Sequence, residues 1–260
     1  MPSPDLEKIA ADLESLEETI IARLIDRAQF RRNRQAYLPG RSGFEGERKA
    51  SLFAVRLRYQ EEMDACFGRF CVPEERPFTG HLPSPRRRVH LPENCLKIDD
   101  YDRVNLTAPI QASYLELVGQ ICPPGDDAQY GSSVEHDVYA IQAISRRIHY
   151  GALYVAESKY RANPEAFDAL LATGDRSRLL ARLTRAEVEA RILDRVAGKV
   201  ETLQASAAGG TRHRIDPAVV RNYYADWIIP LTKEGQMRYL QQRGMNRMKA
   251  HQPADKRGKQ

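Results

Sequence analysis

The sequence predicts an all-α fold, a single-domain helical bundle with long central helices. Apolar residues recur every three or four positions over most of the chain, which is the period of an amphipathic helix. No segment alternates apolar and polar residues as a half-buried strand would. With 260 residues, 42% of them hydrophobic, the chain can bury one large core. We expect one domain over residues 1–242 and a basic, disordered tail over residues 243–260.

The N-terminal part predicts two helices joined by a loop. Apolar residues from Ile9 to Ala28 share one face and give a first helix of about 28 residues, for which Ser3-Pro4 is a start signal. Residues 31–48 are rich in Arg, Gly and Pro and predict a loop. A second helix is expected at roughly 49–70.

Prolines then separate the second helix from the third. Four of them fall between residues 71 and 85, and no helix tolerates that density. A long connecting segment is therefore expected, followed by a short helix around 107–121 that ends at Pro123-Pro124-Gly125.

The clearest helical pattern begins near Ser133 and runs to about Tyr160. Asn163-Pro164 breaks it, and two short helices are expected next, one of them ended by Gly174. The string Thr184-Arg185-Ala186-Glu187 has the form of a capping box and opens another long helix.

The last predicted helix has its own start signal. A Gly209-Gly210 loop precedes it, Asp216 is a favoured N-cap residue, and Pro217 suits the first helical position. Pro230 lies inside this helix and predicts a kink there.

The net charge of +5 is carried by the tail. Residues 243–260 hold six Lys or Arg and one Asp, whereas residues 1–242 hold 34 basic and 34 acidic residues. A nucleic-acid-binding domain carries its basic excess on a folded face, so we expect no nucleic-acid partner. No apolar run reaches the ~18 residues of a membrane helix and no signal peptide is visible, so we expect a cytoplasmic protein without membrane contact.

Common motifs for metals, nucleotides and nucleophiles are absent from the sequence. It contains no G-x-G-x-x-G, Walker A, H-E-x-x-H or G-x-S-x-G string. None of the six histidines has a glutamate three residues earlier, and the four cysteines form no C-x-x-C pair. We therefore expect no metal and no cofactor. Few enzyme classes remain, and one of them is a reaction that needs only shape and fixed charge.

Three pairs of polar residues lie in register with apolar helix faces. They are Thr232 with Gln236, Arg185 with Glu189, and Arg147 with Lys159. The first two pairs are four residues apart and share a face, and the third lies on one long helix. Taken alone, each is most simply interpreted as a solvated surface pair.

Several longer strings give these pairs another meaning. They are Arg146-Arg147-Ile148-His149-Tyr150-Gly151, Val155-Ala156-Glu157-Ser158-Lys159-Tyr160, Gln129-Tyr130-Gly131-Ser132 and Trp227-Ile228-Ile229-Pro230-Leu231-Thr232-Lys233-Glu234. In their order and spacing, from about residue 6 to 242, the chain resembles the all-helical chorismate mutases of fungi and plants. The resemblance implies a homodimer.

The resemblance also implies the conversion of chorismate to prephenate, an intramolecular Claisen rearrangement. Because no proton moves and no covalent intermediate forms, the site has to hold a dicarboxylate as its compact reacting conformer and stabilise charge on the ether oxygen. By resemblance, Arg147 grips one carboxylate, Lys159 donates to the ether oxygen, and Glu189 accepts from the substrate hydroxyl. Thr232 and Gln236 complete the pocket.

The chain departs from the family at the second carboxylate and at the ether oxygen. The first-helix arginine of the family falls at Ala10, and we expect Arg185 to replace it from across the pocket. The alternative is that Arg185 caps its helix or is solvated. Gln236 stands where the fungal enzymes have a glutamate. An amide donates at any pH, so activity is expected to change little between about pH 5 and 8.

The spacing of the central helix is a third departure. Arg147 and Lys159 are 12 residues apart, where the family has 11. Eleven residues return to the same helix face, whereas twelve miss it by roughly 100°. A π-bulge can absorb one extra residue, so we expect a local distortion near residues 151–155.

The effector site of the family is only partly present. In the family, aromatic amino acids bind at the dimer interface through two arginines and a Gly-Ser loop. Gly131 and Ser132 persist, but only Arg69 remains of the arginine pair, and Glu135 replaces a threonine. These changes argue against feedback by tyrosine or tryptophan. A non-catalytic or regulatory relative is the alternative function, and a second cation facing the pocket would discriminate against it.

Overall fold

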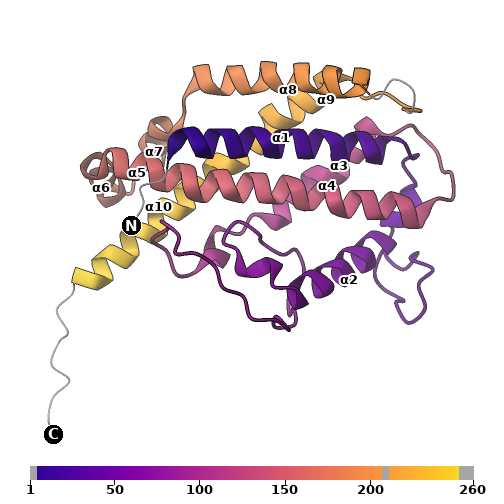
Figure 1. The fold of residues 1–260 in the computed structure, drawn as a ribbon, viewed down its shortest axis with the longest axis horizontal. Helices are drawn as coiled ribbons and strands as arrows, with labels where there is room; N and C mark the ends of the chain where they lie inside the picture. The colour runs from indigo at the N-terminus through magenta and orange to yellow at the C-terminus, as the bar shows by residue number, and fades with distance from the viewer. Residues whose placement is uncertain (1–4, 207–210, 252–260) are drawn as a thin grey trace, which may run out of the picture.

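The computed structural model describes residues 5–206 and 211–251, and within them it contains helices and no strand. Figure 1 shows three long helices side by side: α1 (Leu6–Ala28), α4 (Tyr130–Tyr150) and α8 (Ala186–Ser206). The fourth, α10 (Ile229–His251), crosses them obliquely. The predicted all-α bundle with long central helices is confirmed.

Shorter helices close the two ends and one side of this bundle. They are α2 (Leu52–Cys66), α3 (Thr107–Ile121), α5 (Ala156–Ala162), α6 (Pro164–Thr173), α7 (Arg176–Leu183) and α9 (Pro217–Tyr223), with 3₁₀ turns at Arg34–Tyr37, Arg69–Cys71 and Tyr101–Val104. Figure 1 shows α5, α6 and α7 gathered at one end, beside the start of α1. This end of the bundle carries the cavity described below.

Local signals place most element boundaries. The third helix occupies 107–121 as predicted, Gly174 ends α6 with φ of +66°, and the Asp216 side chain caps α9 by accepting from the N–H of Ala218. Asp5 caps α1. The predicted start at Ser3-Pro4 and the Gly209-Gly210 loop lie outside the described residues.

The predicted boundary of the tail at residue 243 is wrong. α10 continues to His251, and Nε of Arg243 donates to the buried carboxylate of Glu157 at 2.7 Å. The guanidinium of Arg243 also lies 3.5 Å from the ring centroid of Tyr160. An ion pair thus holds this part of the helix. An ion pair produces no apolar periodicity, so the sequence pattern does not reveal it. Residues 252–260 lie outside the described part of the chain.

Two hydrophobic clusters meet along the central helix. Ile148 of α4 belongs to the larger cluster, between α1, α2, α3, α4, α8 and α9, whereas Ala152 belongs to a smaller one around α5, α6, α7 and α10. Between these residues the helix changes register. Gly151–Val155 is a π-helical segment, which confirms the distortion predicted near residues 151–155.

A second π-helical segment, Tyr224–Ile228, precedes Pro230. Pro230 has no N–H to donate to the preceding turn, and the turn before it widens. The predicted disturbance of the last helix is therefore present, and it takes the form of a π segment between α9 and α10.

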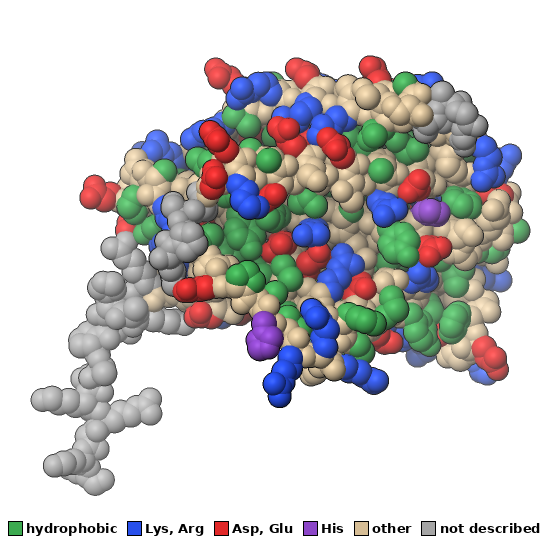
Figure 2. Space-filling model, in the orientation of Figure 1, with side chains coloured by type: hydrophobic (Ala, Val, Ile, Leu, Met, Phe, Trp, Pro, Cys, Tyr) green, Lys and Arg blue, Asp and Glu red, His purple; other side chains and the backbone are tan. Residues whose placement is uncertain are grey.

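The surface that carries α1, α4 and α8 has mixed charge. Figure 2 shows acidic and basic side chains interspersed over this face. Within the described ranges, every helix is too short or too polar to span a bilayer.

A close approach between α10 and the π segment leads to a stability prediction. A Cβ added at Gly235 would lie 2.5 Å from the Cβ of Ala152. We expect Gly235→Ala to lower the free energy of unfolding by about 1–3 kcal/mol through overpacking, as measured by urea denaturation. Gly198→Ala is the control, because its added Cβ meets no atom within 4 Å. Equal stability of the two variants would contradict the prediction.

Candidate active site

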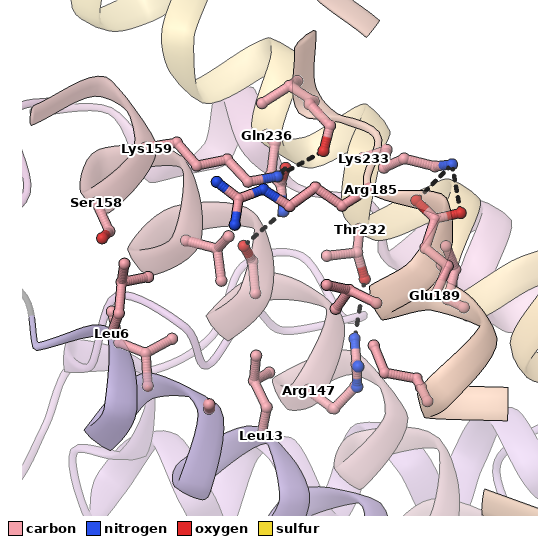
Figure 3. A pocket seen from close by; sticks show the side chains of 18 of the residues that line it. Leu6, Leu13, Arg147, Ser158, Lys159, Arg185, Glu189, Thr232, Lys233 and Gln236 are labelled. Atoms are coloured by element: carbon pink, nitrogen blue, oxygen red, sulfur yellow. Dashed lines mark hydrogen bonds and ion pairs between the residues drawn. The ribbon is translucent and has the colours of Figure 1, made fainter. Parts of the chain in front are cut away.

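A cavity of about 370 Å³ lies between α1, α4, α5, α8 and α10. It brings together all six residues predicted to be catalytic or substrate-binding: Arg147, Lys159, Arg185, Glu189, Thr232 and Gln236. Leu6, Ile9, Ala10 and Leu13 of α1 form an apolar wall opposite them. α1 therefore supplies no cation to the cavity, and the charged groups among its described lining residues come from α4, α5, α8, α10 and the connection between α7 and α8 (Figure 3).

Arg147 lies on α4 and is only 3% exposed. Its Nη1 donates to Oγ1 of Thr232 at 3.2 Å, and its Nη2 lies 3.8 Å from a carboxylate oxygen of Glu17. The Nε of Arg147 is buried and has no hydrogen-bond partner in the described chain. Since a guanidinium carries five N–H groups, Arg147 retains donors for a carboxylate in the cavity.

Glu17 balances the charge of Arg147 from behind. It is fully buried on α1, and its two oxygens accept from Arg195 of α8 at 2.9 and 3.0 Å. Lys199 lies 3.6 Å away. Glu17 therefore stays paired even if Arg147 turns towards a ligand.

Lys159 lies on α5, past the π segment. Its ammonium donates to the carbonyl of Leu183 at 2.6 Å and to Oε1 of Gln236 at 3.4 Å, which leaves one N–H for a ligand. Burial, together with the neighbouring Arg185 and Lys233, lowers the pKa of Lys159 to about 8, although Glu189 acts in the opposite direction.

Gln236 and Glu189 face the cavity from α10 and α8. Nε2 of Gln236 donates to the carbonyl of Gly151, inside the π segment, at 3.2 Å, and its second N–H remains. Both oxygens of Glu189 accept from Lys233 at 3.1 Å. A carboxylate has about four lone-pair sites, so Glu189 can still accept from a ligand hydroxyl.

Arg185 lies in the short connection between α7 and α8. Figure 3 shows its side chain extending across the cavity towards Lys159 and Gln236. The side chain makes no hydrogen bond or ion pair with any residue in the described part of the chain. The hydroxyl of Thr184, the first residue of the predicted capping box, donates to the carbonyl of Leu180 in α7, so its main contact is with α7 and not with the start of α8. A second cation therefore does face the pocket.

The predicted effector residues lie away from this cavity. Arg69 donates to Asp64 at 2.8 Å, to Glu75 at 3.0 Å and to Gln142 of α4 at 2.7 Å. Gly131 and Ser132 are exposed in the first turn of α4, three helical turns, or about 16 Å, before Gln142. One chain alone does not bring these residues together.

Metal ligation finds no support among the residues that the structure describes, since no group of three or more His, Cys, Asp or Glu side chains could hold an ion there.

The comparisons with known proteins agree on one family. No family model matches the chain. The chorismate mutase of Schizosaccharomyces pombe is 37% identical over 246 residues, which cover 90% of this chain and 94% of the relative. Chloroplastic chorismate mutase 1 of Petunia hybrida is 36% identical over 257 residues, with 92% and 75% covered. The chain belongs to the chorismate mutase family.

Solved chorismate mutases have the same fold. The enzyme from Candida albicans, in complex with L-Trp, superposes with a TM-score of 0.87 at 30% identity, covering 93% of this chain and 92% of that one. The chloroplast chorismate mutase from Zea mays gives 0.79 at 34% identity, with 92% and 94% covered. The resemblance seen in the sequence is confirmed.

Three polar residues in or beside this cavity were not predicted. Glu17 interrupts the apolar stripe of the first helix, which is a usable signal. Lys233 adjoins Thr232 and lies one turn before Gln236, so its spacing also offers a signal. Ser158 lines the cavity beside α1, and nothing in the sequence distinguishes it from a surface serine.

Proposed function

We propose that this chain is a chorismate mutase that converts chorismate to prephenate. In this rearrangement the ether C–O bond breaks while a new C–C bond forms within the same molecule, and no proton is transferred. The observation that carries the proposal is the convergence of Arg147, Lys159 and Arg185 on one cavity with an apolar wall. Three cations suit a dicarboxylate with a developing charge on its ether oxygen, and Arg147, which is buried, acts at the lowest dielectric of the three.

The geometry supports a division of roles. Arg147 grips one carboxylate through its fork of donors, and Thr232 fixes its orientation at 3.2 Å. Lys159 and Gln236 donate to the ether oxygen, and their mutual contact at 3.4 Å holds them together. Glu189 accepts from the substrate hydroxyl. Each group is in place before the substrate binds, so little reorganisation is needed in the transition state.

A direct assay tests the proposal. The purified chain is mixed with chorismate, the loss of its ultraviolet absorbance is followed, and the product is identified as prephenate. Rapid conversion of chorismate to prephenate supports the proposal that the chain is a chorismate mutase. A folded sample that binds chorismate without converting it would instead support the non-catalytic alternative.

Arg185 is proposed to hold the second carboxylate. We expect Arg185→Gln to raise KM by about 10- to 100-fold, because it removes a charge-assisted contact that the substrate makes in the ground state. Steady-state kinetics measure the change. Ala10 lines the same cavity from α1. Adding Ala10→Arg to the Arg185→Gln variant should therefore lower KM again. An unchanged KM in Arg185→Gln would show that this arginine is only solvated.

The pKa of Lys159 sets the expected pH dependence. Below about pH 8 Lys159 is protonated in the free protein, and above it the cation is lost. We expect kcat/KM to be nearly flat from about pH 5 to 7.5 and to fall above about pH 8. The fall in kcat lies at higher pH, because a bound dianion stabilises the ammonium.

Two variants serve as controls for this profile. Gln236→Glu should lose activity above about pH 6, because a carboxyl group donates only when it is protonated. Lys159→Arg keeps its charge and should remove the fall near pH 8 from whatever activity is left. A profile of the unchanged chain that falls sharply above about pH 6 would contradict the assignment of Gln236.

Regulation by aromatic amino acids is proposed to be weak or absent. One solved relative holds L-Trp and another holds tyrosine in its allosteric site. In this chain Arg69 is already paired with Asp64 and Glu75, so an effector carboxylate would have to displace both. Glu135 adds a further negative charge on α4. Addition of tyrosine or tryptophan to the assay tests this proposal.

A homodimer is the second part of the proposed organisation. Tyr59 and Met63 of α2 and its C-cap residue Phe67 are 47%, 50% and 69% exposed, and their spacing of four places them on one face of that region. Such a stripe supports a symmetric contact with a second copy. Light scattering on the protein as it elutes from a size-exclusion column measures its mass. A monomer at micromolar concentration would contradict the proposed homodimer.

A further inference from the structure

A second cavity adjoins the candidate active site. It has a volume of about 340 Å³ and shares Lys159, Ala162 and Arg185 with the main cavity. Its other walls come from α6 and α7 and include Asn163, Phe167, Arg182 and Thr184. We call it the outer cavity. The shared side chains make the two cavities neighbours with a common wall of positive charge.

The charge of the outer cavity has one sign. Three cations line it, Lys159, Arg182 and Arg185, and none of its lining residues in the described chain is acidic. Arg182 is exposed, and its side chain makes no hydrogen bond or ion pair with any described residue. Other arginines of α7 are paired, Arg176 with Glu234 and Arg178 with Asp175. The free charge of this helix is therefore concentrated at the cavity.

A concave site with unpaired charge of one sign concentrates ions of the opposite sign. Arg182 and Arg185 are both exposed, but Arg182 lines only the outer cavity whereas Arg185 lines both, so an anion that enters through the outer cavity meets Arg182 before it reaches the main cavity. We propose that the outer cavity is the entrance for the anionic substrate and that Arg182 is its capture residue. The proposal rests on the proposed function, because chorismate supplies the dianion.

The expected effect separates capture from chemistry. Arg182 lies outside the main cavity, so it does not touch the reacting atoms once the substrate is bound. Removing its charge should weaken attraction of substrate and transition state alike, which raises KM and leaves kcat unchanged. Salt should cancel the difference, because the interaction acts across solvent.

The experiment compares three variants with the unchanged chain at about 20 mM and about 500 mM salt. We expect Arg182→Gln to lower kcat/KM by about fivefold at low salt and by less than about 1.5-fold at high salt. Arg182→Lys keeps the charge and should retain kcat/KM. Arg191→Gln removes an exposed arginine of α8 that lines neither cavity, and should match the unchanged chain.

Three results would overturn the proposal. They are an unaltered kcat/KM in Arg182→Gln at low salt, an equal loss in Arg191→Gln, and a loss in Arg182→Gln that persists at high salt. The last would indicate a structural role. Failure of the unchanged chain to convert chorismate would contradict the proposed function instead, so the two failures are distinguishable.

Discussion

Replacing Arg147 with alanine is expected to lower kcat/KM for chorismate by about a thousandfold, which is the loss seen when one partner of a buried charge pair or a transition-state donor is removed. Arg147 is 3% exposed and is the cation deepest in the cavity. Steady-state kinetics on the two proteins measure the loss. Arg147→Lys keeps the charge but not the fork, so we expect it to lose about 10- to 100-fold.

The neighbouring Arg146 provides a matched control. It is adjacent in the same helix but half-exposed, and it pairs with Glu75 at 3.3 Å on another face. Arg146→Ala should therefore keep most of the activity. The fold should survive the loss of Arg147, because Glu17 keeps its contacts with Arg195 and Lys199. If Arg147→Ala retains more than about a tenth of kcat/KM, Arg147 does not hold a reacting carboxylate.

The sequence predicts the fold and most of the cavity because both depend on repeated local patterns. Helix faces, caps and proline breaks place the elements, and the 12-residue spacing between Arg147 and Lys159 predicts the π segment at Gly151–Val155. The cavity brings together three residues that lie inside the family strings, Arg147, Lys159 and Thr232, and three that were placed by the order and spacing of the resemblance, Arg185, Glu189 and Gln236. A motif of this length constrains backbone position and side-chain direction together.

Long-range pairing sets the limit of that prediction. Arg243 belongs to α10 because it meets Glu157, which is 86 residues earlier in the chain. Its neighbours are polar, so the segment has the composition of a tail. Glu17 and Arg195 are 178 residues apart and pair in the same way. Ion pairs between distant helices have no periodic signature, and only the folded chain shows which charges are matched.

One ion pair between distant helices has both of its side chains fully buried. Arg27 of α1 and Asp137 of α4 are both fully buried, and Nε of Arg27 donates to Asp137 at 2.6 Å. The hydroxyls of Tyr37 and Tyr114 also donate to this carboxylate, at 2.6 and 2.7 Å. We expect Asp137→Asn to lower the free energy of unfolding by about 3–5 kcal/mol, because it leaves a buried guanidinium without its counter-charge.

Urea denaturation of two further variants separates the charge from the position. Asp26→Asn removes the partner of Arg23 in a pair whose side chains are each 44% exposed, and should cost less than about 0.5 kcal/mol. Arg27→Met with Asp137→Leu removes both buried charges and should recover part of the stability lost in Asp137→Asn. Full recovery is not expected, because Tyr37 and Tyr114 then lose their acceptor. If the free energy of unfolding of Asp137→Asn lies within about 1 kcal/mol of that of the unchanged chain, the buried pair does not hold α1 against α4.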